Sequence, residues 1–334
     1  MPAAALDWKQ VNQDGFVKNF TPDPTGAGTN LVAFDNQPYA ATANGLFHLE
    51  DPLTQFWTPW VPGNPPSGPG PATSLIPLGN ALYAYSSGQI WFWAAGTNPR
   101  NVQTGWQAVT STGLPGGVGP APKALFNGRI YGVYTPPSGV FEIWRTANMG
   151  VASAAWEQVA ANALGDPTNH TGVDLMIVYN NRILLGIRSL GTGPFGDPSN
   201  YHTGVEVWDS STGNSGSWSK VNANGFGTLY QGCVSSVCKF AIHQVLGSAM
   251  TYKPAGAAQE YLYVGTLSHF GAEIFRCDGS GAAGWTNVTQ PWAGQCSFGC
   301  TGPGRNNSMA VYRDSLYVAE GFPKANLSRF DGSG

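Results

Sequence analysis

Charged residues are scarce in this 334-residue chain, where Asp, Glu, Lys and Arg together make up 10% and the formal net charge is −3. Soluble proteins commonly hold about 25% charged residues. No cluster of Lys and Arg is present, so the electrostatic basis for nucleic-acid binding is missing. No apolar run reaches the roughly 18 residues that a membrane-spanning helix requires. We therefore expect neither a nucleic-acid partner nor a membrane span.

Local catalytic and metal-binding motifs are also missing. The sequence contains no Gly-x-Ser-x-Gly elbow and no phosphate-binding loop. It has no His-x-His, His-x3-His or Cys-x2-Cys spacing, which are common in local metal sites. No short motif therefore identifies a reaction or a catalytic residue.

A degenerate repeat is what the chain does contain. Its anchor is Trp-x-x-Val, followed by a Gly-Phe-like pair in most copies. The anchors are Trp8…Val11, Trp106…Val109, Trp156…Val159, Trp218…Val221 and Trp285…Val288, with Trp57…Trp60 as a variant. Two-residue polar turns such as Asn127-Gly128 stand before apolar-aromatic pairs, as in β-hairpins. A third run, GAEIFR at 271–276, recurs in degraded form in the other copies.

Each repeat thus supplies four short strands, which is the composition of a β-propeller blade. We predict an all-β, six-bladed β-propeller with four-stranded blades over one domain, residues 1–334. The chain ends where the sixth repeat needs its Trp strand, whereas the N-terminus has a spare one. We therefore expect residues 8–11 to complete the last blade and close the ring, which removes long exposed strand edges.

The units YLYVGT, GAEIFR, GWTNV and NGFG resemble a widespread group of secreted bacterial and archaeal propeller-repeat proteins, largely uncharacterised. The resemblance covers nearly the whole chain and implies the fold, but no activity. Several propeller lectins bind sugar with residues repeated in every blade. This chain differs, because its polar loop residues are concentrated in three repeats, which favours one asymmetric site.

Five cysteines bear on the cellular compartment. Cys233 with Cys238, and Cys296 with Cys300, form two close pairs, while Cys277 stands alone. We expect two disulfides and one buried thiol, hence a secreted protein in an extracellular or periplasmic setting. Five reduced cysteines in a cytosolic protein are the alternative.

The later repeats are longer than the early ones, and the added residues fall in connections that leave the same end of a four-stranded meander. Four of the five histidines map there, two of them, His170 and His243, in the loops that enter repeats four and five. We expect a ligand site on this face over repeats four to six, because function concentrates in loops on a rigid scaffold. The candidate residues are His170, Asp174, Tyr201, His202, His243, His269, Trp292 and Asn307.

A divalent metal is one candidate for this face. His170, His202 and His243 are the candidate ligands for Zn or Cu. Asp174, Asn307 and Glu320 are the candidates for Ca. The alternative is that no functional metal binds. In that case the histidines are ordinary polar loop residues, and the cysteine pairs are disulfides that stabilise long loops.

The predicted function is a secreted binding module for a glycan, a small molecule or a protein partner. One alternative is an enzyme at the channel mouth, either a hydrolase or lyase or a metal-dependent oxidoreductase. A structural surface or assembly protein is another, and the oligomeric state is left open. The repeated Glu142, Glu206 and Glu273 are interpreted as a solvated or Arg-paired face. The repeated aromatics Trp91, Trp144, Trp208 and Phe275 are expected between blades.

Overall fold

The structure is a computed structural model, and it describes most of the repeats but not the N-terminal segment. The described residues are 30–34, 37–42, 45–51, 56–59, 74–78, 80–86, 88–94, 106–114, 119–147, 153–189, 204–227, 233–234, 237–238, 243–268, 273–288, 304–312, 314–320 and 326–330. The predicted closing strand, residues 8–11, lies outside them, and so does the closure of a ring.

The fold is all-β. The described part of the chain contains 26 strands and no α-helix, and its helical turns are the 3-10 elements η1 (Asn162–Gly165), η3 (Asn224–Gly227) and η4 (Gly281–Gly284). Among the described residues, no helix is long and apolar enough to cross a membrane.

Two units divide the chain, namely residues 1–134 with 144–157, and residues 135–143 with 158–334. The strands of the first three repeats are β1 (Asn30–Phe34), β2 (Gln37–Thr42), β3 (Gly45–Asp51), β4 (Phe56–Pro59), β5 (Ser74–Leu78), β6 (Ala81–Ser86), β7 (Gln89–Ala94), β8 (Gln107–Thr112), β9 (Ala121–Phe126), β10 (Arg129–Tyr134), β11 (Glu142–Thr146), β12 (Ser153–Ala155) and β13 (Glu157–Ala160).

The second half of the chain follows the same plan. Its strands are β14 (His170–Tyr179), β15 (Arg182–Ser189), β16 (Glu206–Ser210), β17 (Ser219–Lys220), β18 (Cys233–Val234), β19 (Val237–Cys238), β20 (His243–Tyr252), β21 (Tyr261–Ser268), β22 (Ile274–Cys277), β23 (Trp285–Asn287), β24 (Gly304–Tyr312), β25 (Ser315–Glu320) and β26 (Asn326–Phe330).

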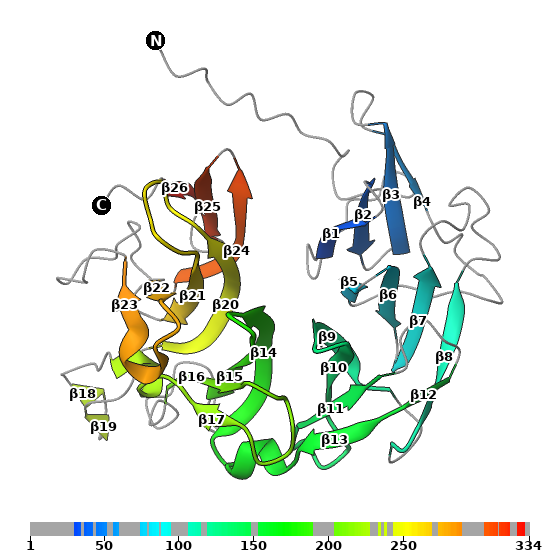
Figure 1. The fold of residues 1–334 in the computed structure, drawn as a ribbon, viewed down its shortest axis with the longest axis horizontal. Helices are drawn as coiled ribbons and strands as arrows, with labels where there is room; N and C mark the ends of the chain where they lie inside the picture. The colour runs from blue at the N-terminus through cyan, green and yellow to red at the C-terminus, as the bar shows by residue number, and fades with distance from the viewer. Residues whose placement is uncertain are drawn as a thin grey trace. The chain divides into compact units, whose positions relative to one another are not determined.

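The sheets are antiparallel meanders, in which neighbouring strands mostly follow one another along the chain (Figure 1). The orders are β1-β2-β3-β4, β5-β6-β7-β8, β9-β10-β11-β13 and β14-β15-β16-β17, with the small β12 added in parallel to β8. Strands β20-β21-β22-β23 and β24-β25-β26 continue the pattern and are joined where β21 pairs with β24. The four-stranded repeat predicted from the sequence is confirmed for repeats one to five.

The hairpin turns are of the kind that the polar dipeptides predict. Asn127 and Gly128 have φ values of 48° and 69°, and Asn180 and Asn181 have 49° and 55°. Two consecutive residues with positive φ match the type I′ turn, whose twist suits the flanking strands. Asn and Gly tolerate this left-handed conformation better than other residues.

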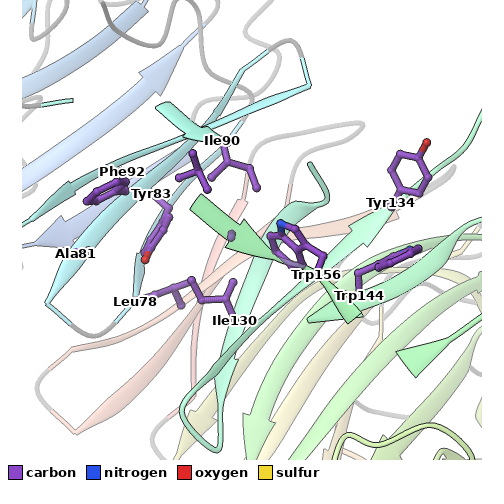
Figure 2. Close-up of a cluster of buried hydrophobic side chains, with 11 residues drawn as sticks. Leu78, Ala81, Tyr83, Ile90, Phe92, Ile130, Tyr134, Trp144 and Trp156 are labelled. Atoms are coloured by element: carbon purple, nitrogen blue, oxygen red, sulfur yellow. The ribbon is translucent and has the colours of Figure 1, made fainter. Parts of the chain in front are cut away.

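The core of the first unit consists of apolar residues from neighbouring sheets. Figure 2 shows side chains from β5, β6, β7, β10 and β11, with Trp156, in one cluster. Tyr134 and Trp144 meet edge to face, with ring centroids 6.4 Å apart. In the second unit, Phe275 stacks on Phe226 at 4.0 Å. The stack with Phe226 of repeat four confirms the packing between repeats expected of Phe275. Trp144 meets the same expectation through its cluster with residues of β5, β6 and β7.

The Trp of the Trp-x-x-Val anchor joins successive repeats in the second unit. The indole of Trp218 donates a hydrogen bond to the carbonyl of Val159, 3.2 Å away. The indole of Trp285 donates in the same way to the carbonyl of Val221 at 2.7 Å. The Trp of one repeat therefore binds the Val of the preceding repeat.

Candidate functional site

A buried histidine lies at the start of repeat four. His170 is the first residue of β14, and its side chain is 3% exposed. Its Nε2 lies 3.1 Å from Oε2 of Glu206, the first residue of β16. Its Nδ1 lies 2.7 Å from the carbonyl oxygen of Ala163 in η1. The expectation that His170 is a loop residue was wrong, because β14 begins at this position.

The carboxylate of Glu206 accepts two further hydrogen bonds. The indole N–H of Trp208 lies 2.7 Å from Oε2, and Nζ of Lys220 lies 3.2 Å from Oε1. Burial raises the pKa of Glu206, but the hydrogen bonds from His170 and Trp208 outweigh burial and leave the pKa below its usual range. Glu206 is therefore an ionised carboxylate with three donors around it.

Repeat five has a second histidine–glutamate pair at the same place. His243 is the first residue of β20 and is fully buried, and its Nε2 lies 2.9 Å from Oε2 of Glu273. The pair is close, but the Nε2–H direction misses hydrogen-bond geometry, and Nδ1 has no hydrogen-bond partner among the described residues. Asn287 donates to Oε2 of Glu273 from 2.8 Å. The ring of Phe275 meets that of His243 edge to face at 5.2 Å.

These pairs correct the interpretation of the repeated glutamates. Glu206 and Glu273 were expected on a solvated or Arg-paired face, yet they are only 6% and 4% exposed and each faces a histidine. The physical reason is register. Ser189, the last residue of β15, lies opposite His170, and Ser268, the last residue of β21, lies opposite His243. The chain leaves each of these strands at the histidine end and returns there with the glutamate, so Glu206 and Glu273 come back beside their histidines.

Asp174, another candidate, is also engaged within the fold. It forms an ion pair with Arg188, whose Nε lies 2.8 Å from Oδ1. Its Oδ2 accepts a hydrogen bond from the backbone N–H of Leu246 in the next repeat, at 3.2 Å. The Asp174 side chain is 3% exposed. The carboxylate therefore joins repeats four and five.

The long insertions attach at the histidine end of these sheets. Segment 190–203 follows Ser189, the register partner of His170. Segment 228–242 leads to His243, whose register partner is Ser268. Segment 289–303 leads to Gly304, which pairs with Ser268. The strands that flank these insertions therefore begin or end at the same end of the sheets, whereas a ligand site on the insertions stays a prediction.

Other candidates fall outside the described residues. They are Tyr201, His202, His269 and Trp292, together with the side chains of Asn307 and Glu320. Convergence of His170, Asp174, His202, His243 and Asn307 on one cleft therefore stays a prediction. The predicted metal site of His170, His202 and His243 is not formed at His170 in this structure, because both nitrogens of its ring face Ala163 and Glu206. Within the described part of the chain, no group of three His, Cys, Asp or Glu residues is arranged to hold a metal ion.

Of the five cysteines, only Cys277 has a side chain that the structure describes. Cys277 is a buried free thiol, as expected, and burial raises its pKa. Cys233 and Cys238 lie directly opposite each other in the β18–β19 register, but their side chains are not among those described. Cys296 and Cys300 lie outside the described ranges, so both predicted disulfides stay predictions.

Sequence reasoning missed the pairing of histidine with glutamate, although a signal was present. His170 and His243 each begin a ten-residue strand that ends in a tyrosine, Tyr179 or Tyr252. Aligning the repeats on these tyrosines places the two histidines in register. Two repeats that share both a His and a Glu indicate a paired contact.

Comparison with known proteins shows the fold alone. No family model matches the chain, and no curated protein matches it. A chain of Kuenenia stuttgartiensis hydrazine synthase is 9% identical, with 91% of this chain and 83% of that chain covered and a TM-score of 0.51. Apocarotenoid oxygenase of Synechocystis is 12% identical, with 92% and 69% covered and a TM-score of 0.49. The N-terminal domain of Nup159 is 10% identical, with 87% and 72% covered and a TM-score of 0.46. The fold is β-propeller-like and all-β.

Proposed function

We propose that this protein is a secreted, six-bladed β-propeller that binds carbohydrate through the insertions on repeats four to six. Residues 8–11 supply the fourth strand of repeat six and close the ring. Two facts support this closure. The described strands of repeat six are β24, β25 and β26, and the Trp-x-x-Val run supplies the fourth strand in earlier repeats, for example β23 in repeat five.

The observation that carries the binding function is where the insertions attach. All three join repeats four to six at the end where His170, His243 and their glutamates are buried. The buried hydrogen-bonded network of His170 and Glu206 stiffens the strand ends of repeat four. Rigid strand ends that carry variable segments are typical of binding sites, because they fix the starting geometry of each segment.

The composition of the insertions favours carbohydrate. Tyr201, Trp292 and Phe298 lie in them, with His202 nearby, and the whole chain carries little charge. A flat aromatic ring covers the apolar face of a sugar, while neighbouring polar groups hydrogen-bond its hydroxyls. In this proposal His170, His243 and Asp174 fix the strand ends to which the insertions attach, and the aromatic residues of the insertions contact the ligand.

Binding is tested with insoluble cellulose, chitin and xylan, followed by an array of soluble glycans. We expect retention on at least one of them. The double variant Tyr201→Ala/Trp292→Ala should lose about tenfold or more in affinity, because a buried aromatic contact contributes about 2 kcal/mol or more to binding. Its melting temperature should stay within about 2 °C of wild type, since surface substitutions usually change stability by less than about 0.5 kcal/mol.

The matched control is Val178→Ala, which alters an exposed side chain on β14 outside the insertions. It should bind as the wild type does. Failure of every polysaccharide and glycan to bind would overturn the carbohydrate proposal. Full binding by the double variant would place the ligand away from these insertions.

A further inference from the structure

The surroundings of His170 determine its protonation state. Its Nδ1 faces the carbonyl oxygen of Ala163, and its Nε2 faces the carboxylate of Glu206. A carbonyl oxygen and a carboxylate oxygen accept hydrogen bonds but cannot donate them. Both ring nitrogens must therefore carry a proton for both contacts to form. The geometry makes His170 an imidazolium cation inside the protein.

The charges around the ring agree with this state. The charged groups of the described residues that face it are Glu206 on β16, Lys220 on β17, which contacts the far carboxylate oxygen of Glu206, and Asp166 just before β14. Trp208 meets the ring edge to face at 6.0 Å and is neutral. Burial lowers the pKa of His170, but the hydrogen bonds to Glu206 and Ala163 outweigh it, so the pKa stands above its usual value of 6.5.

The same cation connects three segments of the fold. Ala163 belongs to η1, which leads into repeat four, and its N–H donates to the carbonyl of Phe141 at 3.1 Å. His170 begins β14, and Glu206 begins β16 after segment 190–203. Removing one proton from the ring leaves a lone pair against either the carbonyl or the carboxylate. A buried acceptor without its donor is costly, so this junction opens more readily once His170 is neutral.

We propose that the His170 cluster, defined as Ala163, His170, Glu206, Trp208 and Lys220, is a pH-dependent junction. It holds the start of β16 against η1 and β14 when His170 is protonated, and it loosens that strand start as the pH rises. The consequence for ligand binding rests on the proposed function, whereas the junction itself does not. Repeat five provides an internal comparison, because Nδ1 of His243 faces no acceptor among the described residues.

The sign of the pH effect follows from two pKa shifts. The pKa of His170 is raised by folding, so its contribution to stability is complete below 6.5 and is lost as the pH rises through the native value. The pKa of Glu206 is lowered by folding, so its contribution is present above 4.5 and is lost as the pH falls through the native value. The junction is most stable between these limits and weakens on the alkaline side.

The first test is NMR of the full chain with 15N-labelled histidine, assigned with His170→Gln. We expect both ring nitrogens of His170 to be protonated at pH 6 and the ring to titrate above pH 6.5. In Glu206→Gln the His170 signal should titrate at lower pH. A His170 ring that is singly protonated at pH 6, or an unchanged titration in Glu206→Gln, would overturn the imidazolium assignment.

The second test is amide hydrogen exchange, corrected for the intrinsic pH dependence of exchange. Exchange at residues 163–165 and 204–206 should accelerate by about tenfold in the wild type as the pH rises through the His170 titration, and at residues 243–246 it should not. His170→Gln should show fast exchange at all pH values. Protection at 204–206 that stays constant while His170 loses its proton would overturn the junction.

Neither test needs a ligand, so both separate this inference from the carbohydrate proposal. Loss of binding on every polysaccharide would leave the NMR and exchange results standing. If a polysaccharide binds, its affinity should fall as the pH rises through the His170 titration. Equal affinity on both sides of that titration would overturn the regulatory consequence alone.

Discussion

Substitution of Gly186 by alanine tests the packing between repeats four and five. Gly186 lies in β15, opposite Leu175 of β14 and Val207 of β16. A Cβ atom at this position would lie 2.7 Å from Cγ of Leu175 and would overlap Cδ1 of Leu246. Leu246 is 2% exposed and belongs to the core cluster of the second unit, so it has little space to move.

The expected destabilisation follows from two opposing effects. Overpacking a well-packed core costs about 1–3 kcal/mol. Replacing glycine also reduces the entropy of the unfolded chain, which returns about 0.4–1 kcal/mol. The net loss should be about 0.5–2 kcal/mol. For a unit of this size, that corresponds to a fall in melting temperature of roughly 1–8 °C.

Thermal and urea unfolding measure this difference, and Gly172 provides the matched control. Gly172 lies on the neighbouring strand β14, and a Cβ atom there would meet nothing within 4 Å. Gly172→Ala should be as stable as the wild type or slightly more stable. The double variant Gly186→Ala/Leu246→Val should lose less than the sum of the single changes, because valine has no Cδ atom. Equal stability of Gly186→Ala and Gly172→Ala would refute the packing argument.

Two further predictions concern the ends of the chain and the thiols. Deletion of residues 1–12 should lower the melting temperature by roughly 5 °C or more if these residues close the ring, and unchanged cooperative unfolding would contradict the closure. In protein from an oxidising compartment, unfolding without reductant should expose one reactive thiol, Cys277, whereas the native protein should react slowly because Cys277 is buried. Five reactive thiols after unfolding would remove the argument for secretion.

The sequence by itself determined the strands and turns of this protein. The hairpin at Asn180-Asn181 could be predicted because a two-residue turn with positive φ values depends on local sterics, which Asn satisfies. The four-stranded unit could be predicted because each strand is short, and its apolar and aromatic residues repeat along the chain. The repeat also located the ends at which insertions attach, since a meander sends alternate connections to the same end.

The tertiary structure decided the roles of the buried polar residues. Trp285 was recognised as an anchor, but its hydrogen bond to the carbonyl of Val221 depends on the packing of one repeat against the next. His170 and Glu206 are far apart in sequence and looked like a loop residue and a surface residue. They meet because β14 and β16 flank β15, so residues at the matching ends of those strands lie close in space. Such pairing depends on register and on burial, neither of which is encoded within one strand.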